Sequence, residues 1–351
     1  MDINLKSIRN TQFTGKTVLL RADLDVPLKN EEISDDLRLT ASLETINYLL
    51  RKTKTIIIIG HLGRPEGEDR KLSLEAIAKW YADKLKGDLK ETKVKGFTGW
   101  EIIPGLVLLE NLRFYAEEEK NDEEFSKRLA FLADVYVNDA FSSSHRAHAS
   151  IVGITKYLPV FAGLRLQKEV EQLSKVLNQP KRPLTVVIGG AKIETKLPLV
   201  EKMNHFADYV LVGGEIAEND KVLIKVQHEK ITGKKSIVLV ADLTGDKKEI
   251  TEKSAENFVS VLGLSATIVW NGPMGQIENE AFQKGTEILA NGIISSKAYT
   301  VVGGGDTLGF LKTKNMLDKF SFVSTGGGAM LEFLAGVKLP GLGVLEKKSY
   351  S

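Results

Sequence analysis

The sequence predicts an α/β protein with two domains, each built on a parallel sheet, and a helix that joins them. Short runs rich in β-branched residues alternate with longer segments of helical period along the chain. Most of these runs are apolar throughout rather than alternating, which is typical of strands covered on both faces. The length of 351 residues fits about two domains of ~100–200 residues each.

The first domain is expected over residues 1–160. The Asp35-Asp36 pair suits the start of its first helix, because the helix dipole favours negative charge there. The expected strands are 18–24, 55–60, 106–110 and 135–138, and the expected helices are 36–50, 74–85 and 122–132.

The second domain is expected over residues 179–336, after a linking segment at 161–178. Apolar residues recur at helical spacing over 164–178, and Gln179-Pro180 follows, so we expect this segment to be a connecting helix. The expected strands of the second domain are 184–188, 209–212, 237–240, 267–270, 300–302 and 322–324.

Composition excludes several classes of function. The chain has no cysteine, which rules out disulfides, thiolate zinc sites and cysteine nucleophiles. A net charge of +2 gives no electrostatic reason to expect a nucleic-acid or membrane partner. The apolar runs are far shorter than the ~20 residues of a membrane helix. The N-terminus lacks the layout of a signal peptide, so we expect a soluble cytoplasmic protein.

Positive side chains follow the expected strands of the first half. In open parallel sheets, ligands bind at the carboxyl ends of the strands. Guanidinium groups hold small anions by bidentate hydrogen bonds, so the pattern predicts an anion site. A metal site is the weaker alternative, because the arginines would repel a cation. The residues concerned are Arg21, Arg38, His61, Arg64, Arg113, His145, Arg146 and His148.

Glycines follow the expected strands of the second half. Gly303-Gly304-Gly305-Asp306-Thr307 comes after one strand and opens a helix, so backbone N–H groups could bind phosphate while Asp306 reaches Mg²⁺. The alternative is a tight turn in which Asp306 caps the helix. A second triple glycine, Gly326-Gly327-Gly328, favours the phosphate interpretation, because glycine usually marks a close backbone approach. Further strand ends carry Gly189-Gly190 and Gly213-Gly214.

Two further segments could contact a nucleotide. Lys192 and Lys196 share one face of a helix if a helix begins there, and they could bind the phosphate chain, although lysines are usually surface residues. The loop from Asn271 to Gly275 contains Pro273, and Glu278 beyond it could bind a ribose hydroxyl or be a first-turn acid of a helix. Neither the P-loop motif nor the dinucleotide glycine fingerprint occurs.

Taken in order, these segments resemble the phosphoglycerate kinase family over nearly the whole chain. The matching segments are 21–28, 33–38, 61–65, 110–114, 136–148, 189–192, 270–275, 303–307 and 324–329. The resemblance implies two Rossmann-like domains that face each other across a cleft and close for transfer, with the tail 337–351 packed on the N-terminal one. The implied reaction is reversible phosphoryl transfer between 1,3-bisphosphoglycerate and ADP, with Mg²⁺, in a monomer.

The resemblance also assigns roles to residues. Phosphoglycerate would bind to Asp23, Asp25, Arg38, His61, Arg64, Arg113 and Arg146. The transferring group would be neutralised by Arg38 and Lys192 with the amides of Gly327 and Gly328. The nucleotide would bind to Lys192, Lys196, Asn271, Pro273, Gly303, Gly304, Gly305 and Thr307, with Asp306 for the metal and Glu278 for the ribose. Arg21 is interpreted as structural, and His145 and His148 as neighbours that order the loop of Arg146.

The chain departs from the family pattern at several positions. Asp25 replaces the usual Asn, Thr195 replaces an Asp, and Glu215 stands where a third small residue is usual. The segment 215–250 is shorter than usual and lacks a long helix and the Gly-Leu loop that covers the base. These departures motivate one alternative, a catalytically weakened protein that binds phosphoglycerate or nucleotide. A nicotinamide-dependent dehydrogenase fits the fold class but lacks the fingerprint.

Overall fold

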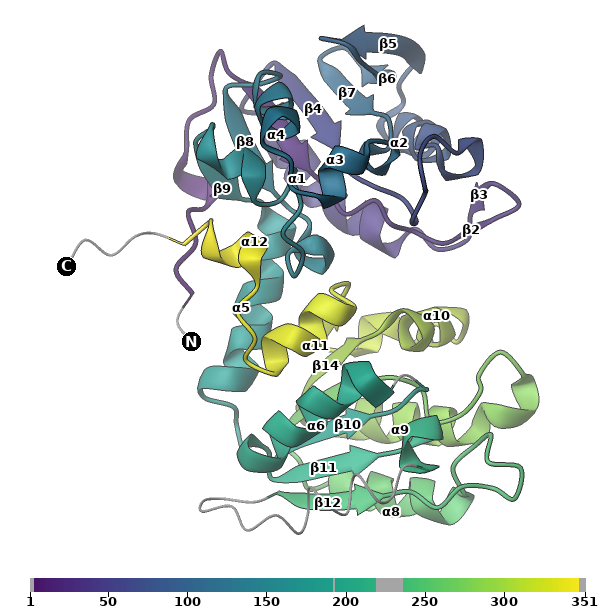
Figure 1. Cartoon of the computed structure of the whole chain (residues 1–351). Coiled ribbons are helices and arrows are strands. Elements are labelled where there is room, and N and C mark those ends of the chain that lie inside the picture. Colours follow the sequence, from purple (N-terminus) through teal and green to yellow (C-terminus); the bar gives the residue numbers. More distant parts are fainter. Residues whose placement is uncertain (1–2, 192, 219–235, 347–351) are drawn as a thin grey trace, which may run out of the picture. The chain divides into compact units, whose positions relative to one another are not determined.

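The computed structural model describes residues 3–191, 193–218 and 236–346 (Figure 1). They form two compact units, one of residues 3–171 with 338–346 and the other of residues 172–337. Helix α5 (Leu164–Asn178) contains the point at which the chain passes from one unit to the other. Each unit has an α/β architecture with its own sheet, in agreement with the predicted fold class.

The sheet of the first unit has seven strands in the order β5-β6-β7-β4-β1-β8-β9. Strand β1 lies in the interior of the sheet and pairs in parallel with β4 and β8. The strands are β1 (Thr17–Arg21), β4 (Thr55–Ile59), β5 (Lys90–Val94), β6 (Phe97–Ile103), β7 (Leu106–Leu109), β8 (Val135–Asn138) and β9 (Val160–Ala162). A separate hairpin pairs β2 (Leu28–Lys29) with β3 (Glu32–Ile33).

One edge of this otherwise parallel sheet is antiparallel, a feature that the predicted fold class did not include. Strands β5 and β6 form a hairpin, and β6 also runs antiparallel to β7. The β5–β6 turn consists of Lys95 and Gly96, which both have positive φ, at 46° and 96°. A two-residue turn of this kind matches the twist of paired strands and can only reverse the chain.

Helices and short turns complete the first unit. Asp122 caps α4 (Glu123–Ala130) by accepting a hydrogen bond from the N–H of Phe125 at 2.8 Å. The C-terminal segment also packs here, because Leu345 O accepts from Lys6 N and Gly341 N donates to Ser144 O. The helices are α1 (Leu37–Leu50), α2 (Glu75–Leu85), α3 (Ala116–Glu119), α4 (Glu123–Ala130) and α12 (Pro340–Gly343), with 3-10 turns at Ile8–Asn10, Arg70–Leu72, Leu112–Phe114, Phe141–Ser143 and Gly153–Lys156.

The sheet of the second unit is parallel throughout, in the order β12-β11-β10-β13-β14-β15. Its two central strands, β10 and β13, are buried at every residue, which explains their continuous apolar sequence. The strands are β10 (Leu184–Ile188), β11 (Tyr209–Val212), β12 (Ile237–Val240), β13 (Thr267–Asn271), β14 (Tyr299–Gly303) and β15 (Phe322–Ser324).

Helices follow the strands of the second unit along the chain. They are α6 (Ile193–Phe206), α8 (Glu252–Leu262), α9 (Lys284–Ser295), α10 (Gly305–Thr313) and α11 (Gly328–Leu334), with 3-10 turns at Gly214–Glu218, Glu280–Phe282 and Leu317–Lys319. Helices α10 and α11 begin within four residues of the strand before them. Across both units, none of the helices in the described ranges is both long enough and apolar enough to cross a membrane.

Candidate functional site

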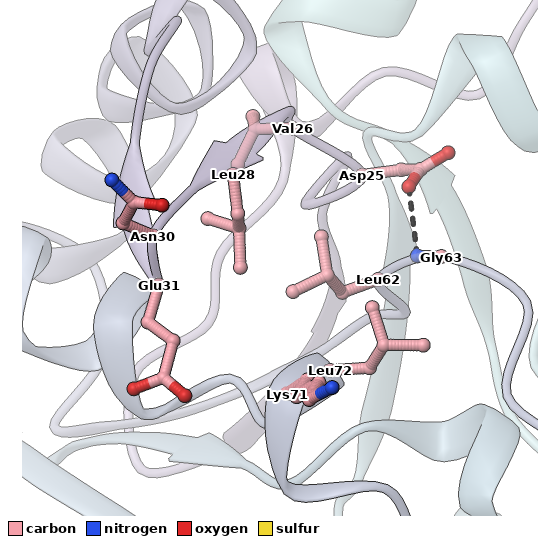
Figure 2. A pocket seen from close by; sticks show the side chains of 9 residues that line it. All are labelled: Asp25, Val26, Leu28, Asn30, Glu31, Leu62, Gly63, Lys71 and Leu72. Carbon is pink, nitrogen blue, oxygen red and sulfur yellow. Dashed lines mark hydrogen bonds between the residues drawn. The ribbon is translucent and has the colours of Figure 1, made fainter.

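The loop after β1 and the loop after β4 meet through Asp25 and Gly63. The parallel register pairs Arg21 with Ile59, so the two loops leave the sheet side by side. The Oδ1 atom of Asp25 accepts a hydrogen bond from the N–H of Gly63 at 2.9 Å (Figure 2). Asp25 is therefore held in place by backbone, and its Oδ2 atom remains available to other groups.

A cavity of about 490 Å³ lies beside this contact (Figure 2). Its walls are mainly apolar, and its single cation, Lys71, is outnumbered by two carboxylates, those of Asp25 and Glu31. An anionic ligand would gain little there, so we place the anion site elsewhere. The lining residues are Asp25, Val26, Leu28, Asn30, Glu31, Leu62, Gly63, Lys71 and Leu72.

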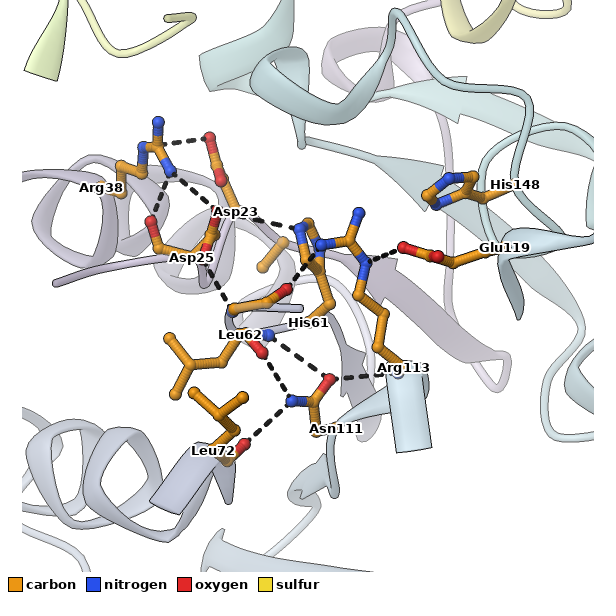
Figure 3. Close-up of polar contacts among 12 residues, drawn as sticks. Asp23, Asp25, Arg38, His61, Leu62, Leu72, Asn111, Arg113, Glu119 and His148 are labelled. Atoms are coloured by element: carbon orange, nitrogen blue, oxygen red, sulfur yellow. Dashed lines mark hydrogen bonds and ion pairs between the residues drawn. The ribbon is translucent and has the colours of Figure 1, made fainter. Parts of the chain in front are cut away.

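Arg38 and two carboxylates form a charged group at the same edge of the sheet (Figure 3). Arg38 lies in the first turn of α1, where its Nε atom is 3.7 Å from Asp23 Oδ2 and its Nη1 atom is 3.9 Å from Asp25 Oδ2. It also donates to the backbone carbonyl of Asp25. Arg38 therefore offsets part of the negative charge of Asp25, while the same guanidinium group also pairs with Asp23.

Asn111 joins the loops that carry His61 and Arg113, and sequence alone assigned it no role. It is fully buried; its Nδ2 atom donates to the carbonyls of Leu62 and Leu72, both at 2.8 Å, and its Oδ1 atom accepts from Arg113 N at 3.1 Å (Figure 3). Its sequence signal was weak: an amide directly after a strand end. The structure shows that it fixes both loops at once.

Arg113 lies in the 3-10 turn after β7 and is mostly buried. Its Nε atom forms an ion pair with Glu119 Oε1 at 2.8 Å (Figure 3). Its Nη1 atom donates to the carbonyl of Gly63. Burial lowers the pKa of Arg113 from its usual value, an effect that nearby Glu119 opposes. An arginine remains a cation after a shift of this kind.

Two arginines at this edge are not engaged by carboxylates. Arg64 is exposed and Arg146 is half-buried, and neither forms an ion pair with any residue that the structure describes. The histidines of the Arg146 loop differ from them in charge. Burial, then nearby arginines, lower the pKa of His148 to about 4, and burial and Arg146 lower that of His145. The positive charge available to an anion therefore comes from arginines.

In the second unit, the register of the sheet brings the glycine-bearing strand ends side by side. Ile188 pairs with Asn271, Asn271 with Gly303, and Gly303 with Ser324. Two of the glycines are required by packing: a Cβ on Gly189 would lie 2.2 Å from the carbonyl oxygen of Pro273, and one on Gly272 would lie 2.0 Å from that of Gly189. These glycines therefore have a structural reason to be small.

The glycines that open helices α10 and α11 have no such reason. A Cβ on Gly305 or Gly328 would meet nothing within 4 Å. The helix cap before Gly305 is Gly304, with φ +98°, so the alternative in which Asp306 caps the helix is wrong. Asp306 is exposed in the first turn. Packing therefore does not require Gly305 or Gly328, and the opening amides of α10, next to the exposed carboxylate of Asp306, suit a phosphate with its metal ion.

The structure also brings together Lys196, Asn271 and Thr307. The Nζ atom of Lys196 donates to Asn271 Oδ1, and Thr307 Oγ1 accepts from the N–H of Gly272 at 3.0 Å. Lys192 lies outside the described residues. Glu278 is exposed and precedes a 3-10 turn that Asn279 caps, so it is not a first-turn helix acid.

No group of three metal-ligating side chains occurs among the described residues. Mg²⁺ is nevertheless compatible with the second unit, because in nucleotide sites it is usually bound by one or two carboxylates together with substrate phosphates. Asp306 can supply the carboxylate, and its exposed position beside Gly305 fits that arrangement.

Comparison with known proteins agrees with these features. The family model described as phosphoglycerate kinase matches residues 8–242 and 220–337. The phosphoglycerate kinases of Finegoldia magna and Dictyoglomus turgidum are each 38% identical to the chain, over 99% and 97% of it and 100% and 98% of their own lengths. The solved phosphoglycerate kinase of Coxiella burnetii superposes with a TM-score of 0.81 at 33% identity, covering 97% of this chain and 98% of its own. The chain therefore belongs to the phosphoglycerate kinase family.

Proposed function

We propose that the arginine-rich strand ends of the first unit bind phosphoglycerate and that the glycine-rich strand ends of the second unit bind the nucleotide. As a phosphoglycerate kinase by family, the chain catalyses reversible phosphoryl transfer between 1,3-bisphosphoglycerate and ADP. The observation that carries the assignment is that arginines follow strand ends in one unit, whereas the glycines that open α10 and α11 follow strand ends in the other. Guanidinium side chains suit a small acid that carries both carboxylate and phosphate.

In the first unit, Arg64, Arg113 and Arg146 would hold the phosphate of the three-carbon acid. Asp23 and Asp25 lie beside Arg38, and His61 lies beside Asp25. These side chains would bind the three-carbon part of the acid. Arg38 is shared with Asp23 and would offset only part of the charge of Asp25, so Asp25 would still weaken binding of the acid.

In the second unit, the phosphates of the nucleotide would lie against the amides of Gly303, Gly304 and Gly305. Lys196 and Lys192 would add positive charge beside the phosphates, and Thr307 and Asn271 would orient the nucleotide. Pro273 would shape the loop after β13, and Glu278 would bind the ribose. Asp306 would share a Mg²⁺ ion with the phosphates. That ion supplies charge neutralisation for phosphoryl transfer when it is bound.

The chemistry needs little beyond these groups. The acceptor is a carboxylate, already ionised at neutral pH because its reference pKa is about 4, so no general base is required. Phosphoryl transfer depends mainly on position and charge. We assign neutralisation of the transferring group to Arg38 and Lys192 with the amides of Gly327 and Gly328. Direct in-line transfer then requires domain closure to bring the two ligands together. We propose that the enzyme acts as a cytoplasmic monomer.

Turnover of purified protein with 3-phosphoglycerate and Mg-ATP, together with Arg38→Ala, tests this function. The wild type should turn over, and Arg38→Ala should lower kcat by about 10²–10³. Its Tm should move by no more than about 2 °C, because Arg38 is partly exposed. Arg51→Ala removes an exposed arginine at the other end of α1 and should leave kcat unchanged. Absent turnover with every nucleoside triphosphate would sink the proposal.

A further inference from the structure

Arg21 makes three hydrogen bonds in the interior of the first unit. It is the last residue of β1 and is fully buried. Its Nε atom donates to Ser150 Oγ at 2.9 Å, its Nη1 atom donates to the carbonyl of Ala22 at 2.6 Å, and its Nη2 atom lies 2.8 Å from His61 Nδ1. The third contact joins a residue interpreted as structural to one expected to contact the substrate.

The chemistry of the guanidinium group determines the direction of that third bond. An arginine side chain carries only N–H donors and stays protonated in proteins. The Nδ1 atom of His61 must therefore accept, which requires an unprotonated Nδ1. An imidazole with one accepting nitrogen is neutral and carries its proton on the other nitrogen, Nε2.

A buried carboxylate balances the charge of Arg21 through a serine. The hydroxyl of Ser150 accepts from Arg21 and donates to Glu118 Oε1 at 2.5 Å, while Ser150 N donates to Glu118 Oε2 at 2.9 Å. Glu118 and Ser150 are fully buried, and Tyr136 donates to the carbonyl of Ser150 at 2.6 Å. Such a satisfied network keeps the guanidinium group in one position.

We propose that Arg21 is a positioning residue that holds His61 as the neutral tautomer with its proton on Nε2, so that His61 offers phosphoglycerate one uncharged, directed hydrogen-bond donor. The free edge of the ring faces the cluster, with Nε2 at 3.9 Å from Asp25 Oδ2 (Figure 3). The inference rests on the proposed function for the contact of His61 with substrate, but the tautomer itself follows from the ligand-free geometry.

The surroundings of His61 favour the same charge state. The charged and titratable groups that face it are Arg21 from β1, Asp25 from the loop after β1, Arg38 from α1, Arg113 from the turn after β7 and His148 from the Arg146 loop. Burial first, then Arg21 and Arg113, lower the pKa of His61 well below its usual value. Binding of the anion therefore relies on arginine charge, with His61 contributing direction.

The direct test is the protonation state of His61 in the ligand-free wild type, read by long-range ¹⁵N–¹H NMR and assigned with His61→Gln. We expect a neutral ring protonated on Nε2 throughout pH 6–8. A proton on Nδ1, or an imidazolium at pH 7, would overturn the proposal. This measurement does not depend on turnover, so a failure of the proposed function would leave it standing.

Kinetics then test the positioning role. The amide N–H of a glutamine at position 61 reaches close to the place of Nε2–H, so His61→Gln should keep the KM for phosphoglycerate within about threefold, whereas His61→Leu should raise it about tenfold or more. Arg21→Lys keeps a donor toward Nδ1 and should preserve the tautomer. Arg21→Met should mix the tautomers and raise the KM for phosphoglycerate, with the KM for ATP unchanged.

Arg21→Met removes the partner of a buried network and could unfold the protein, so Ser150→Ala provides the second variant. It removes one anchor of the guanidinium group and keeps its charge. We expect a mixed tautomer signal at His61 and a three- to tenfold higher KM for phosphoglycerate only. A lower Tm with both KM values altered and the tautomer unchanged would mean that Arg21 is merely structural.

Discussion

At the scale of single residues, Asp25 has two opposing effects on the proposed phosphoglycerate site. Its carboxylate fixes the loop of Gly63 through Oδ1, yet it adds negative charge beside the expected phosphoglycerate. Arg38 and His61 each lie 3.9 Å from its Oδ2 atom, but His61 is neutral, so of these two groups Arg38 alone offsets that charge. The same guanidinium group must serve Asp23, Asp25 and the substrate.

Asp25→Asn should therefore tighten substrate binding. An asparagine keeps an oxygen for the N–H of Gly63 and removes the charge, so the KM for phosphoglycerate should fall about three- to tenfold at low ionic strength. Glu31→Gln is the control, because it removes a carboxylate from the exposed rim of the neighbouring cavity and should leave that KM unchanged. A KM that rises in Asp25→Asn would show that the carboxylate itself binds the substrate.

Substitution of two glycines in α10 distinguishes an effect on ligand binding from an effect on helix stability. A Cβ at Gly305 or at Gly309 would meet nothing within 4 Å, and both residues belong to α10. Gly305→Ala should raise the KM for ATP about tenfold or more, because the methyl group would project into open space that the nucleotide phosphates are proposed to occupy. Gly309→Ala should leave the KM unchanged and add up to about 1 kcal/mol of stability, as alanine usually does within a helix. Equal kinetics in both variants would remove Gly305 from the nucleotide site.

At the scale of elements, apolar pattern predicted most of the buried strands, but it missed the exposed β5 and also β6 and the three-residue β9, which are largely buried. Helix α5 and strand β8 have the predicted bounds, since both carry clear apolar periodicity or runs. Strand β5 was missed because its residues are polar and mostly exposed, held in the sheet by backbone pairing to β6. The two-residue strands β2 and β3 are too short for any periodicity to show.

Helix α5 begins on a carboxylate from another element. The Oδ1 atom of Asp139, just after β8, accepts from Arg165 N at 2.9 Å and Leu166 N at 3.1 Å. Asp139→Ala should cost about 1–2 kcal/mol in the free energy of unfolding, measured by chemical denaturation, because both amides lose their partner. Asp139→Asn keeps an acceptor and should cost less. Equal costs would show that charge, and not the hydrogen bonds, is what α5 needs.

The contribution of Asp139 to stability changes with pH in a definite direction. Burial raises the pKa of Asp139 from its usual value of 3.8 to about 7. Between these values the unfolded chain has released the proton and the folded one still binds it, so stability from this group is present at low pH and is lost as the pH rises toward 7. Relative to wild type, Asp139→Asn should therefore be more stable at pH 8 than at pH 5.

At the scale of the whole molecule, sequence could predict the kinds of groups at each site but not the contacts between them. Arg21, His61 and Ser150 form one hydrogen-bonded group from three distant parts of the chain, and nothing local to any of them indicates the others. Asn111 donates a hydrogen bond to Leu62, which lies 49 residues away in the chain. The tail likewise returns to pair Leu345 with Lys6. Such long-range contacts depend on the tertiary fold, which strand and helix patterns do not specify.

The assignment of one ligand to each unit can be tested by hydrogen exchange on the intact protein. Each unit has its own sheet, so we expect each to open and exchange its amide hydrogens separately. A ligand should therefore slow exchange in the unit that binds it. At 100 times its Kd a ligand adds about 2.7 kcal/mol, which slows exchange of the most protected amides about a hundredfold. With 3-phosphoglycerate this protection should fall in residues 3–171, strongest around β1 and β4; with Mg-ADP it should fall in residues 172–337, strongest around β13 and β14. Protection in the opposite unit, or shared equally by both units for each ligand alone, would contradict the division between arginine-rich and glycine-rich strand ends.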